Sequence, residues 1–371
     1  MPCAFAGRGV AILFNKLNPA IMSTCTSTCF MIPKYVKEVL IKQGLMNKEV
    51  VKKALAIDAT LRKARKQKLS ELWSSDLVGK PAVKVAKKKA NRTVYNCQNS
   101  EDLEKENLMR TEKVKKLSKD PDANMAFDYG GVVRDYYAKF LNRNSLDNKG
   151  LNLDFYIHYS KGYNNAFWDG TEMVFGDGDG HIFRHLVRGL DVIGHELTHG
   201  VVQYTAGLNS SEFPGTINEH IADVFGTVIK QNYKKQTAKN ADWLIGDEIV
   251  APSFPGKALR SLKAPGTAFK GDPQPADMKH YKPWNQDPHL NNGIPNRAFY
   301  LVAAGVGGNK GLDTRLAGLL WYTALLSLKP TANFKDLYNT VQKAGASLTA
   351  LKKIPDSTKL ITAAFKTVGI I

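Results

Sequence analysis

The 371-residue sequence has no apolar run long enough to span a membrane, so no integral membrane protein is expected. Near the N-terminus, an apolar stretch covers only residues 9–14 and ends at Asn15 and Lys16. That stretch is too short for the hydrophobic part of a secretory signal peptide, so classical secretion is not evident. The compartment stays open, and Met22 and Met31 are alternative functional starts.

Cysteine is scarce as well, with four residues, three of which precede residue 30. A small fold that depends on disulfides needs paired cysteines along its whole length. Only Cys97 lies further along the chain. We therefore expect the main body of the protein to be free of disulfides, which is compatible with a reducing cell interior.

Acidic residues are few relative to basic ones, with 34 Asp and Glu against 52 Lys and Arg and a formal charge of +18. The segment 31–92 alone holds 17 basic and 5 acidic residues, a net charge of +12. Such runs are usually solvated and are good targets for proteolytic nicking, notably in residues 84–92. Polyanion binding is the alternative, but no aromatic interleaving or groove-reading helix supports it.

A short motif carries the first chemical signal: residues 191–200 read D-V-I-G-H-E-L-T-H-G. His195 and His199 are four positions apart, so on a helix both imidazoles can reach a single metal ion. Glu196 projects toward the same cleft, close enough to take a proton from water on the metal. A five-residue pattern also occurs by chance, and the alternative is an amphipathic helix with two surface histidines.

A second motif supplies a third ligand, because residues 216–226 read T-I-N-E-H-I-A-D-V-F-G. A catalytic zinc site needs three protein ligands, and a carboxylate is an accepted third. Glu219 is the candidate ligand, and Asp223, one turn later, is the candidate acceptor of a hydrogen bond from a ligand imidazole. A solvated acidic edge is the plainer interpretation of the same pair.

Together, the H-E-L-T-H motif and N-E-x-x-x-D, with Glu219 twenty positions after His199, resemble the thermolysin family of zinc endopeptidases. Residues 163–180, 258–262 and 287–300 resemble the substrate-edge strand, the pocket lining and the catalytic-histidine segment of that family. The similarity runs over about residues 92–371. The motifs P-G-T-I-N-E-H and A-D-W-L-I-G, with an N-terminal I-P-x-Y, are most similar to the protealysin-like branch, which has a short propeptide.

The resemblance implies an α+β fold with two lobes, a sheet-rich N-terminal lobe and a helical C-terminal lobe, with the zinc helix between them. We expect an N-terminal extension at 1–30, a basic helical propeptide at 31–91, and catalytic lobes at 92–207 and 208–371. Hydrophobic periodicity predicts a helical hairpin over 31–68 and strands at 93–97, 153–159 and 171–175. It predicts helices at 126–142, 188–206, 296–305, 314–327, 334–344 and 357–368, with a helical segment from 216 onward.

The resemblance also implies roles for individual residues. One catalytic zinc ion would be held by His195, His199 and Glu219, with Glu196 as general base. The oxyanion donor would be His289, and the residues that orient the site would be Asn218, Asp223 and Asp287. The substrate would be an extended peptide with a bulky hydrophobic residue after the scissile bond, bound by Asn165, Ala166, Phe183, Val192, Leu259 and Arg260.

Two positions depart from the family pattern. Ser210 stands where many members carry a tyrosine that binds the oxyanion. The double calcium site of the family is represented by Asp191, Asp242 and Asp247, but Lys230 stands where a bridging glutamate is usual. A lysine ammonium can itself neutralise carboxylates, so we expect at most one calcium ion there.

The sequence therefore predicts a zinc-dependent neutral endopeptidase made as a zymogen. Its expected partners are peptide and protein substrates and its own propeptide, with no specific nucleic acid and no membrane, and it is expected to be a monomer. One alternative is an inactive thermolysin-like protein that acts as a protein-binding module, an idea that Ser210 keeps open. Another is a zinc aminopeptidase, which needs an acidic anchor for a free amine that we do not find.

Overall fold

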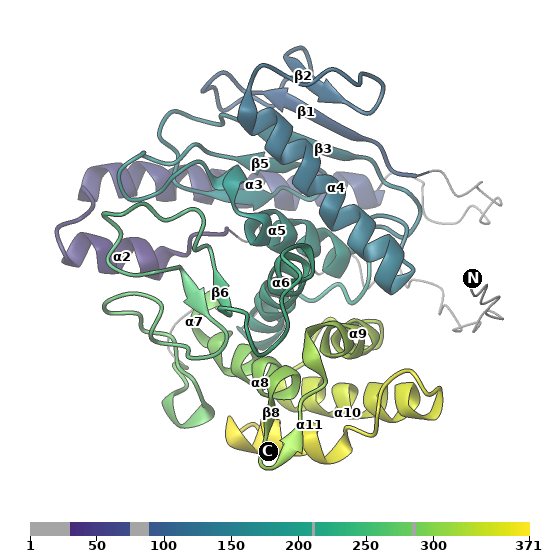
Figure 1. Cartoon of the computed structure of the whole chain (residues 1–371). Coiled ribbons are helices and arrows are strands. Elements are labelled where there is room, and N and C mark those ends of the chain that lie inside the picture. The colour runs from purple at the N-terminus through teal and green to yellow at the C-terminus, as the bar shows by residue number, and fades with distance from the viewer. Residues whose placement is uncertain (1–29, 75–88, 210–211, 284–286) are drawn as a thin grey trace.

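The computed structural model describes residues 30–74, 89–209, 212–283 and 287–371 (Figure 1). The sheet lies at one end of the molecule, α5 and α6 cross its middle, and the later helices form the other end (Figure 1). The strands are β1 (Arg92–Asn96), β2 (Leu108–Thr111), β3 (Leu153–Ile157), β4 (Ala166–Trp168), β5 (Met173–Phe175), β6 (Leu244–Ile245), β7 (Arg260–Ser261), β8 (Gly305–Val306) and β9 (Asn309–Lys310). The helices are α2 (Lys34–Lys42), α3 (Lys48–Ser74), α4 (Pro121–Leu141), η1 (Leu186–Arg188), α5 (Leu190–Gln203), α6 (Glu212–Tyr233), η2 (Met278–His280), α7 (Pro288–Asn291), α8 (Gly293–Ala304), α9 (Asp313–Leu325), α10 (Phe334–Ala350) and α11 (Thr358–Thr367).

The main sheet has five strands in the order β2-β1-β3-β5-β4. β3 pairs in parallel with β1 and β5, whereas β2 and β4 are antiparallel additions at the two edges. β4 is therefore an edge strand of this sheet, and the outer side of its backbone can pair with another extended segment.

The two faces of the sheet pack against different helices. Phe155 on β3 is buried in the large core shared with α4, and the neighbouring Tyr156 faces a smaller cluster that includes Ile57 and Leu61 of α3. This alternation is the period-two pattern of a strand covered on both sides. A Cβ on Gly130 of α4 would come within 2.2 Å of the Phe155 ring, so only glycine allows this approach.

The two helices that carry the zinc motifs cross very closely. A Cβ on Gly226 of α6 would lie 2.6 Å from the carbonyl oxygen of Asp191, and one on Gly194 would lie 3.0 Å from Cα of Gly226. Glycine at both positions lets the backbones of α5 and α6 touch. The close crossing brings the histidines of one helix within reach of Glu219 on the other.

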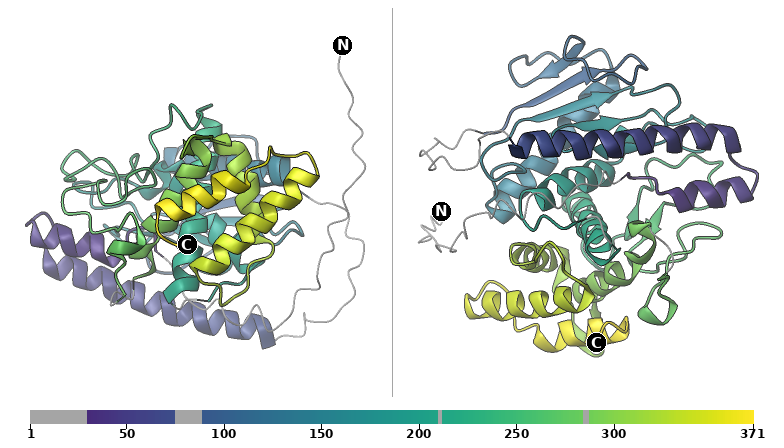
Figure 2. Two further views of the ribbon diagram at one scale, coloured as in Figure 1. Left: turned by 90° about the horizontal axis from the view of Figure 1, so that it is seen from below. Right: turned by 180° about the vertical axis from the view of Figure 1, so that it is seen from behind.

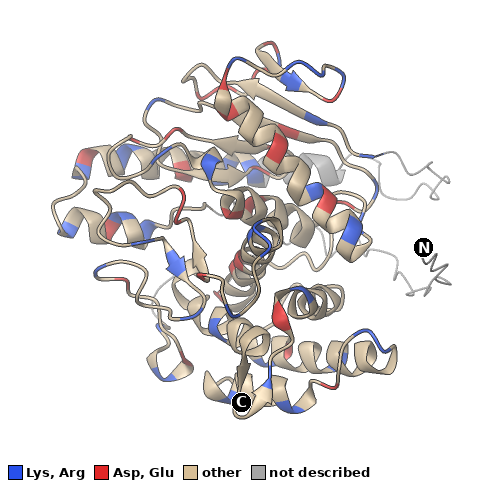
Figure 3. Ribbon diagram, in the orientation of Figure 1, with Lys and Arg blue, Asp and Glu red and all other residues tan. Residues whose placement is uncertain are grey.

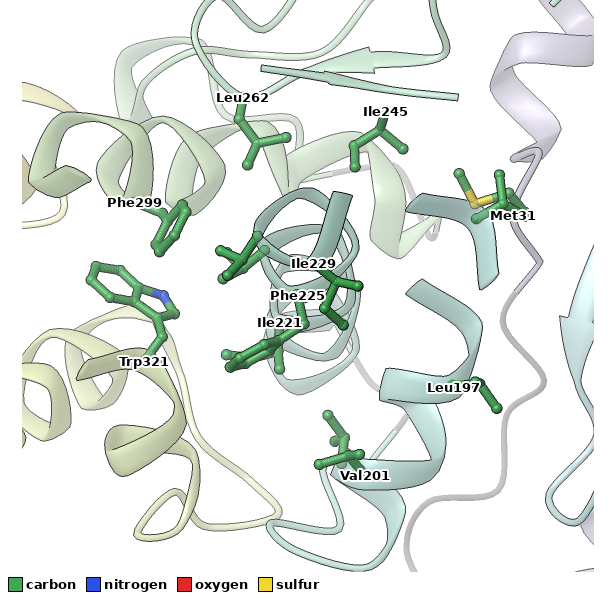
Figure 4. Packing of buried hydrophobic residues seen from close by; sticks show 14 of the residues in the cluster. Met31, Leu197, Val201, Ile221, Phe225, Ile229, Ile245, Leu262, Phe299 and Trp321 are labelled. Atoms are coloured by element: carbon green, nitrogen blue, oxygen red, sulfur yellow. The ribbon is translucent and has the colours of Figure 1, made fainter. Parts of the chain in front are cut away.

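The helical end of the molecule packs onto α6 (Figure 4). Ile221, Phe225 and Ile229 of α6 are fully buried, as are Phe299 of α8 and Trp321 of α9. Burial of large aliphatic and aromatic side chains is the main stabilising contribution at such an interface. α5 and α6 are therefore held within one continuous core that reaches from the sheet to the later helices.

The N-terminal helices α2 and α3 lie on the outside of this body (Figure 2). Basic residues follow both helices (Figure 3). From residue 30 the chain runs outward into α2, and α3 then returns across the molecule beside the sheet (Figure 1). Among the described residues, no helix is both long enough and apolar enough for a membrane span.

The two-lobe α+β architecture agrees with the prediction, but several element boundaries were wrong. α4 begins at Pro121 rather than residue 126, because the Asp120 side chain accepts hydrogen bonds from the backbone of Asp122 and Ala123 and caps the helix. α6 begins at Glu212 instead of residue 216. β2 was not predicted as a strand, since its pairing with β1 is not visible in the local pattern.

Candidate active site

Three candidate ligands meet at the crossing of α5 and α6. Nε2 of His199 lies 3.1 Å from Nε2 of His195. Oε2 of Glu219 lies 3.3 Å and 3.6 Å from these two nitrogens. A tetrahedral zinc ion with bonds of about 2.0–2.1 Å places its ligand atoms about 3.3 Å apart. The three side chains thus fit a zinc ion without rearrangement.

The other nitrogen of each ring is held by an acceptor on α6. Nδ1 of His195 donates to Asp223 at 2.9 Å, and Nδ1 of His199 donates to the Asn218 amide oxygen at 3.0 Å. With its proton on Nδ1, each imidazole presents the Nε2 lone pair to the metal position.

The electrostatics of the group also suit a cation. Burial lowers the pKa of His199 to about 3. Burial alone would also lower the pKa of His195, but Asp223 and Glu219 outweigh burial and raise this pKa to about 9. One positive charge is therefore held between the two rings before a metal binds. A divalent cation replaces that proton and pairs with Glu219, whose Oε1 has no hydrogen-bond partner among the described residues.

Glu196 has one carboxylate oxygen held and the other free. Oε2 accepts a hydrogen bond from the backbone N–H of Trp168 at 3.0 Å, whereas the buried Oε1 has no partner in the described part of the chain. Burial raises the pKa of Glu196 to about 8, against the opposing charge of His195. A divalent ion nearby lowers that pKa again.

His289 approaches the group from the opposite side. It lies in α7, and its Nδ1 donates to Asp287, the N-cap residue, at 2.9 Å. Its Nε2 lies 2.8 Å from Oε2 of Glu219. Burial disfavours the charged ring, but Glu219 and Asp287 outweigh burial and raise the pKa of His289 to about 9. The ring is an imidazolium at neutral pH.

Asp223 is the centre of a wider polar network. Besides His195, it accepts from Arg260 through Nε and Nη2, both at 2.9 Å. It also accepts from Asn292 at 2.8 Å and from Asn296 at 2.9 Å. Burial alone raises the pKa of this carboxyl, but Arg260 and His195 hold it well below its usual range. The two asparagines received no role from the sequence.

The predicted substrate edge is paired with the chain's own N-terminal segment. The backbone N–H of Met31 donates to the carbonyl of Ala166 at 3.1 Å, and that of Ile32 donates to Oδ1 of Asn165 at 2.8 Å. Nη1 of Arg260 donates to the carbonyl oxygen of Met31 at 3.2 Å. An isolated antiparallel bridge joins Phe30 to residue 167 of β4. The segment 30–32 thus lies along β4 as an added strand.

The Met31 side chain is fully buried in the large core. The same core contains Phe183, Val192 and Leu259, the residues predicted to line a hydrophobic pocket. Figure 4 shows Met31 at the end of the core beyond Ile229 and Ile245. Its surroundings in this core are apolar apart from the Arg260 guanidinium, whose Nη2 lies 3.8 Å from Sδ of Met31.

The acidic residues predicted to bind calcium surround Lys230 instead. Its buried Nζ lies 2.8 Å from Asp191, 2.7 Å from Asp247 and 3.9 Å from Asp242. It also donates to the carbonyl oxygen of Leu244 at 2.7 Å. Burial alone lowers the pKa of Lys230, but the carboxylates outweigh it and raise the pKa. Ser210, at the usual tyrosine position, lies outside the described residues.

This fold and this metal centre define a zinc metallopeptidase, and comparisons with known proteins identify the family. The model of the thermolysin metallopeptidase catalytic domain matches residues 78–203, and that of its alpha-helical domain matches residues 206–370. The chain is 42% identical over 275 residues to the extracellular metalloprotease of Pectobacterium carotovorum subsp. carotovorum, covering 71% of this chain and 78% of that protein.

A thermolysin from Alicyclobacillus acidocaldarius subsp. acidocaldarius is 41% identical over 238 residues, which are 62% of this chain and 42% of that protein. Among solved structures, the protealysin precursor of Serratia proteamaculans matches with a TM-score of 0.73 and 34% identity, over 92% of this chain and 100% of the other. The chain belongs to the thermolysin family of zinc metalloendopeptidases, and its likeness to a precursor indicates a zymogen.

Proposed function

We propose that this zymogen hydrolyses internal peptide bonds with Glu196 as general base and His289 as oxyanion donor. One observation carries the proposal: Glu196 Oε1 and His289 Nε2 are buried beside the metal ligands, and neither makes a hydrogen bond of good geometry within the described residues. Buried polar atoms are normally satisfied, and exceptions concentrate where a substrate supplies the partner. The two histidines and Glu219 would hold zinc, which would supply the Lewis acid that polarises the peptide carbonyl and acidifies water.

The chain's own groups divide the remaining work. Glu196 takes the proton of the attacking water at Oε1 and delivers it to the leaving nitrogen when the C–N bond breaks. Because Trp168 fixes Oε2, the free oxygen keeps its direction during both transfers. The imidazolium of His289, oriented by Asp287, donates to the carbonyl oxygen as negative charge develops there.

We propose that the residue after the scissile bond occupies the position of Met31. The N–H and carbonyl of Met31 already use Ala166 and Arg260, as a bound peptide would. Its side chain lies among apolar neighbours, so a bulky hydrophobic residue is favoured there. Asn165 would hold the next residue, in the way that it holds Ile32.

We further propose that residues 31–91 form the propeptide and keep the precursor latent, because residues 30–32 occupy the peptide edge that a substrate needs. The lobes at 92–207 and 208–371 would remain as the mature enzyme. N-terminal sequencing of the active form tests this division, and an active form that keeps residues 31–74 contradicts it.

The propeptide is anchored by a buried carboxylate on α3. Asp58 pairs with Lys37 of α2 at 3.1 Å, and both side chains are almost fully buried. Oδ1 of Asp58 accepts from the Tyr163 hydroxyl at 2.5 Å, and Asn165 donates to Oδ2, the oxygen that pairs with Lys37, at 3.4 Å. One side chain thus joins both propeptide helices to the substrate-binding loop.

Asp58→Asn is therefore expected to weaken the docking of the propeptide by about 3–5 kcal/mol, because Lys37 would remain buried without its counter-ion. The precursor should mature faster and show higher activity before cleavage. Peptide hydrolysis and gel analysis over time measure both effects.

Glu38→Gln is the matched control, since the pair of Glu38 with Lys34 is exposed (49% and 61%). Such a pair contributes about 0.5 kcal/mol or less. Equal maturation rates for Asp58→Asn and the wild-type chain would exclude this anchor.

Removal of zinc with a chelator is expected to abolish cleavage of an N-blocked, internally quenched peptide by the mature form. Adding back about one zinc equivalent per chain should restore the rate. The blocked amine also excludes an obligate aminopeptidase, because cleavage then needs no free N-terminus. Activity that persists after complete zinc removal would refute the metal-dependent mechanism.

A further inference from the structure

A second group of histidines and carboxylates lies outside the active site. It contains Asp122 in the first turn of α4, His158 just after β3, Asp177 in the loop after β5 and His185 before η1. One ligand atom from each lies within 4.8 Å of all the others. Two imidazoles and two carboxylates from separate segments are thus brought to one point, and the catalytic steps use none of them.

The partners of His158 resemble those of a metal-bound histidine. Its Nδ1 faces both oxygens of Asp177 at 2.8 Å. Its Nε2 lies 2.8 Å from Oδ2 of Asp120, the residue that also caps α4. A carboxylate on the far nitrogen of a histidine fixes the ring and increases its basicity as a ligand. Asp120 supplies that support from outside the group of four.

His185 completes the group from the solvent side. Its Nδ1 contacts Oδ2 of Asp122 and lies 3.7 Å from Oδ1 of Asp177. The two imidazoles lie edge to face, with their centroids 6.2 Å apart. Asp122 is only 8% exposed, whereas His185 is 39% exposed, so an ion could enter from the His185 side.

We propose that Asp122, His158, Asp177 and His185 form a second binding site for a divalent transition-metal ion, of which zinc is the best fit. Two nitrogen and two oxygen ligands suit zinc and its neighbours, whereas magnesium and calcium prefer oxygen alone. A tetrahedral ion needs ligand atoms about 3.3 Å apart, so each must move by less than about 1 Å.

The charges of the group also suit a divalent cation. Asp122 and Asp177 bring two carboxylates to the group. Their two negative charges would balance a divalent ion bound there, and buried charges in proteins are normally paired or bound to metals.

The position indicates a structural role for the ion. It would join the start of α4, the end of β3 and the two ends of the segment 177–185. That segment carries Phe183, a proposed wall of the substrate pocket, and leads into η1 and α5. A bound ion would thus stabilise the loop ahead of the zinc helix, and unfolding should become sensitive to metal beyond the catalytic equivalent.

The test measures zinc in the full-length Glu196→Gln chain, which cannot process itself by the proposed mechanism. After loading with zinc and dialysis, elemental analysis should find about two ions per chain. His185→Gln in the same background should retain about one zinc ion. The midpoint of its thermal unfolding should no longer rise when a second equivalent of zinc is added. His199→Gln removes the catalytic ion and should also retain about one, held at the second site.

His181→Gln is the matched control, because His181 is exposed in the same segment and does not belong to the group. It should keep both ions, and circular dichroism should show that every variant is folded. A single zinc per wild-type chain would overturn the proposal. Two ions in His185→Gln would overturn it as well, since the second ion would then lie elsewhere.

Discussion

After an added protease has removed the propeptide, replacement of Glu196 by glutamine should lower kcat/KM for a quenched peptide by about two to four orders of magnitude. The glutamine amide can still accept from Trp168, and the zinc ligands are untouched, so the fold and the metal content should not change. What disappears is the group that takes a proton at Oε1. The loss should therefore fall on kcat, with little change in KM.

The control is Glu104→Gln, since Glu104 is exposed on the surface far along the chain from the metal motifs. It should keep full activity. Measurement of the zinc content of both variants distinguishes loss of the general base from loss of the metal ion. Equal rates for Glu196→Gln and the wild-type chain would disprove the assignment, and loss of zinc from that variant would point to a structural role instead.

Lys230→Met is expected to lower the free energy of unfolding by about 3–5 kcal/mol, because it leaves the buried Asp191 carboxylate without its counter-ion. Asp191 is fully buried and lies only four residues before His195, so the damage falls on the zinc helix. Denaturant unfolding of the zinc-loaded Glu196→Gln chain measures the change. We propose that the ammonium takes the place of calcium here, so calcium should not stabilise the wild-type chain through these carboxylates.

Two further variants sharpen this prediction. Lys234→Met removes a half-exposed pair with Glu248 (32% and 27% exposed) and should cost only about 0–1 kcal/mol. Lys230→Glu adds a carboxylate to the group and should gain stability from calcium that the wild-type chain lacks. If Lys230→Met is as stable as Lys234→Met, the ammonium does not neutralise this site.

The metal ligands could be predicted because their geometry is local. Helical spacing alone places His195 above His199 and Glu219 above Asp223, and one close crossing of two helices brings these pairs together. Asn292 and Asn296 received no role from the sequence, because they bind Asp223 from 69 and 73 residues away. Hydrophobic periodicity carries no information about such a distance.

The propeptide shows the same limit. Periodicity predicted its helical hairpin, but not that residues 30–32 would lie along β4. That pairing joins Ile32 to Asn165 across 133 residues. The apolar run 30–32 is too short to show a hydrophobic period that would predict a strand. The cluster around Lys230 was better anticipated, since the charge of the substituted residue already conflicted with a bound cation.

The strand formed by residues 30–32 has a consequence for the timing of activation. While the chain is continuous, this segment is tethered to the edge that it covers, and its effective concentration there is high. A cut between α3 and β1 removes the tether but none of the contacts. After the cut, the fraction of molecules in which residues 30–32 cover β4 depends on the protein concentration. A nicked sample should therefore remain latent when concentrated and become active on dilution.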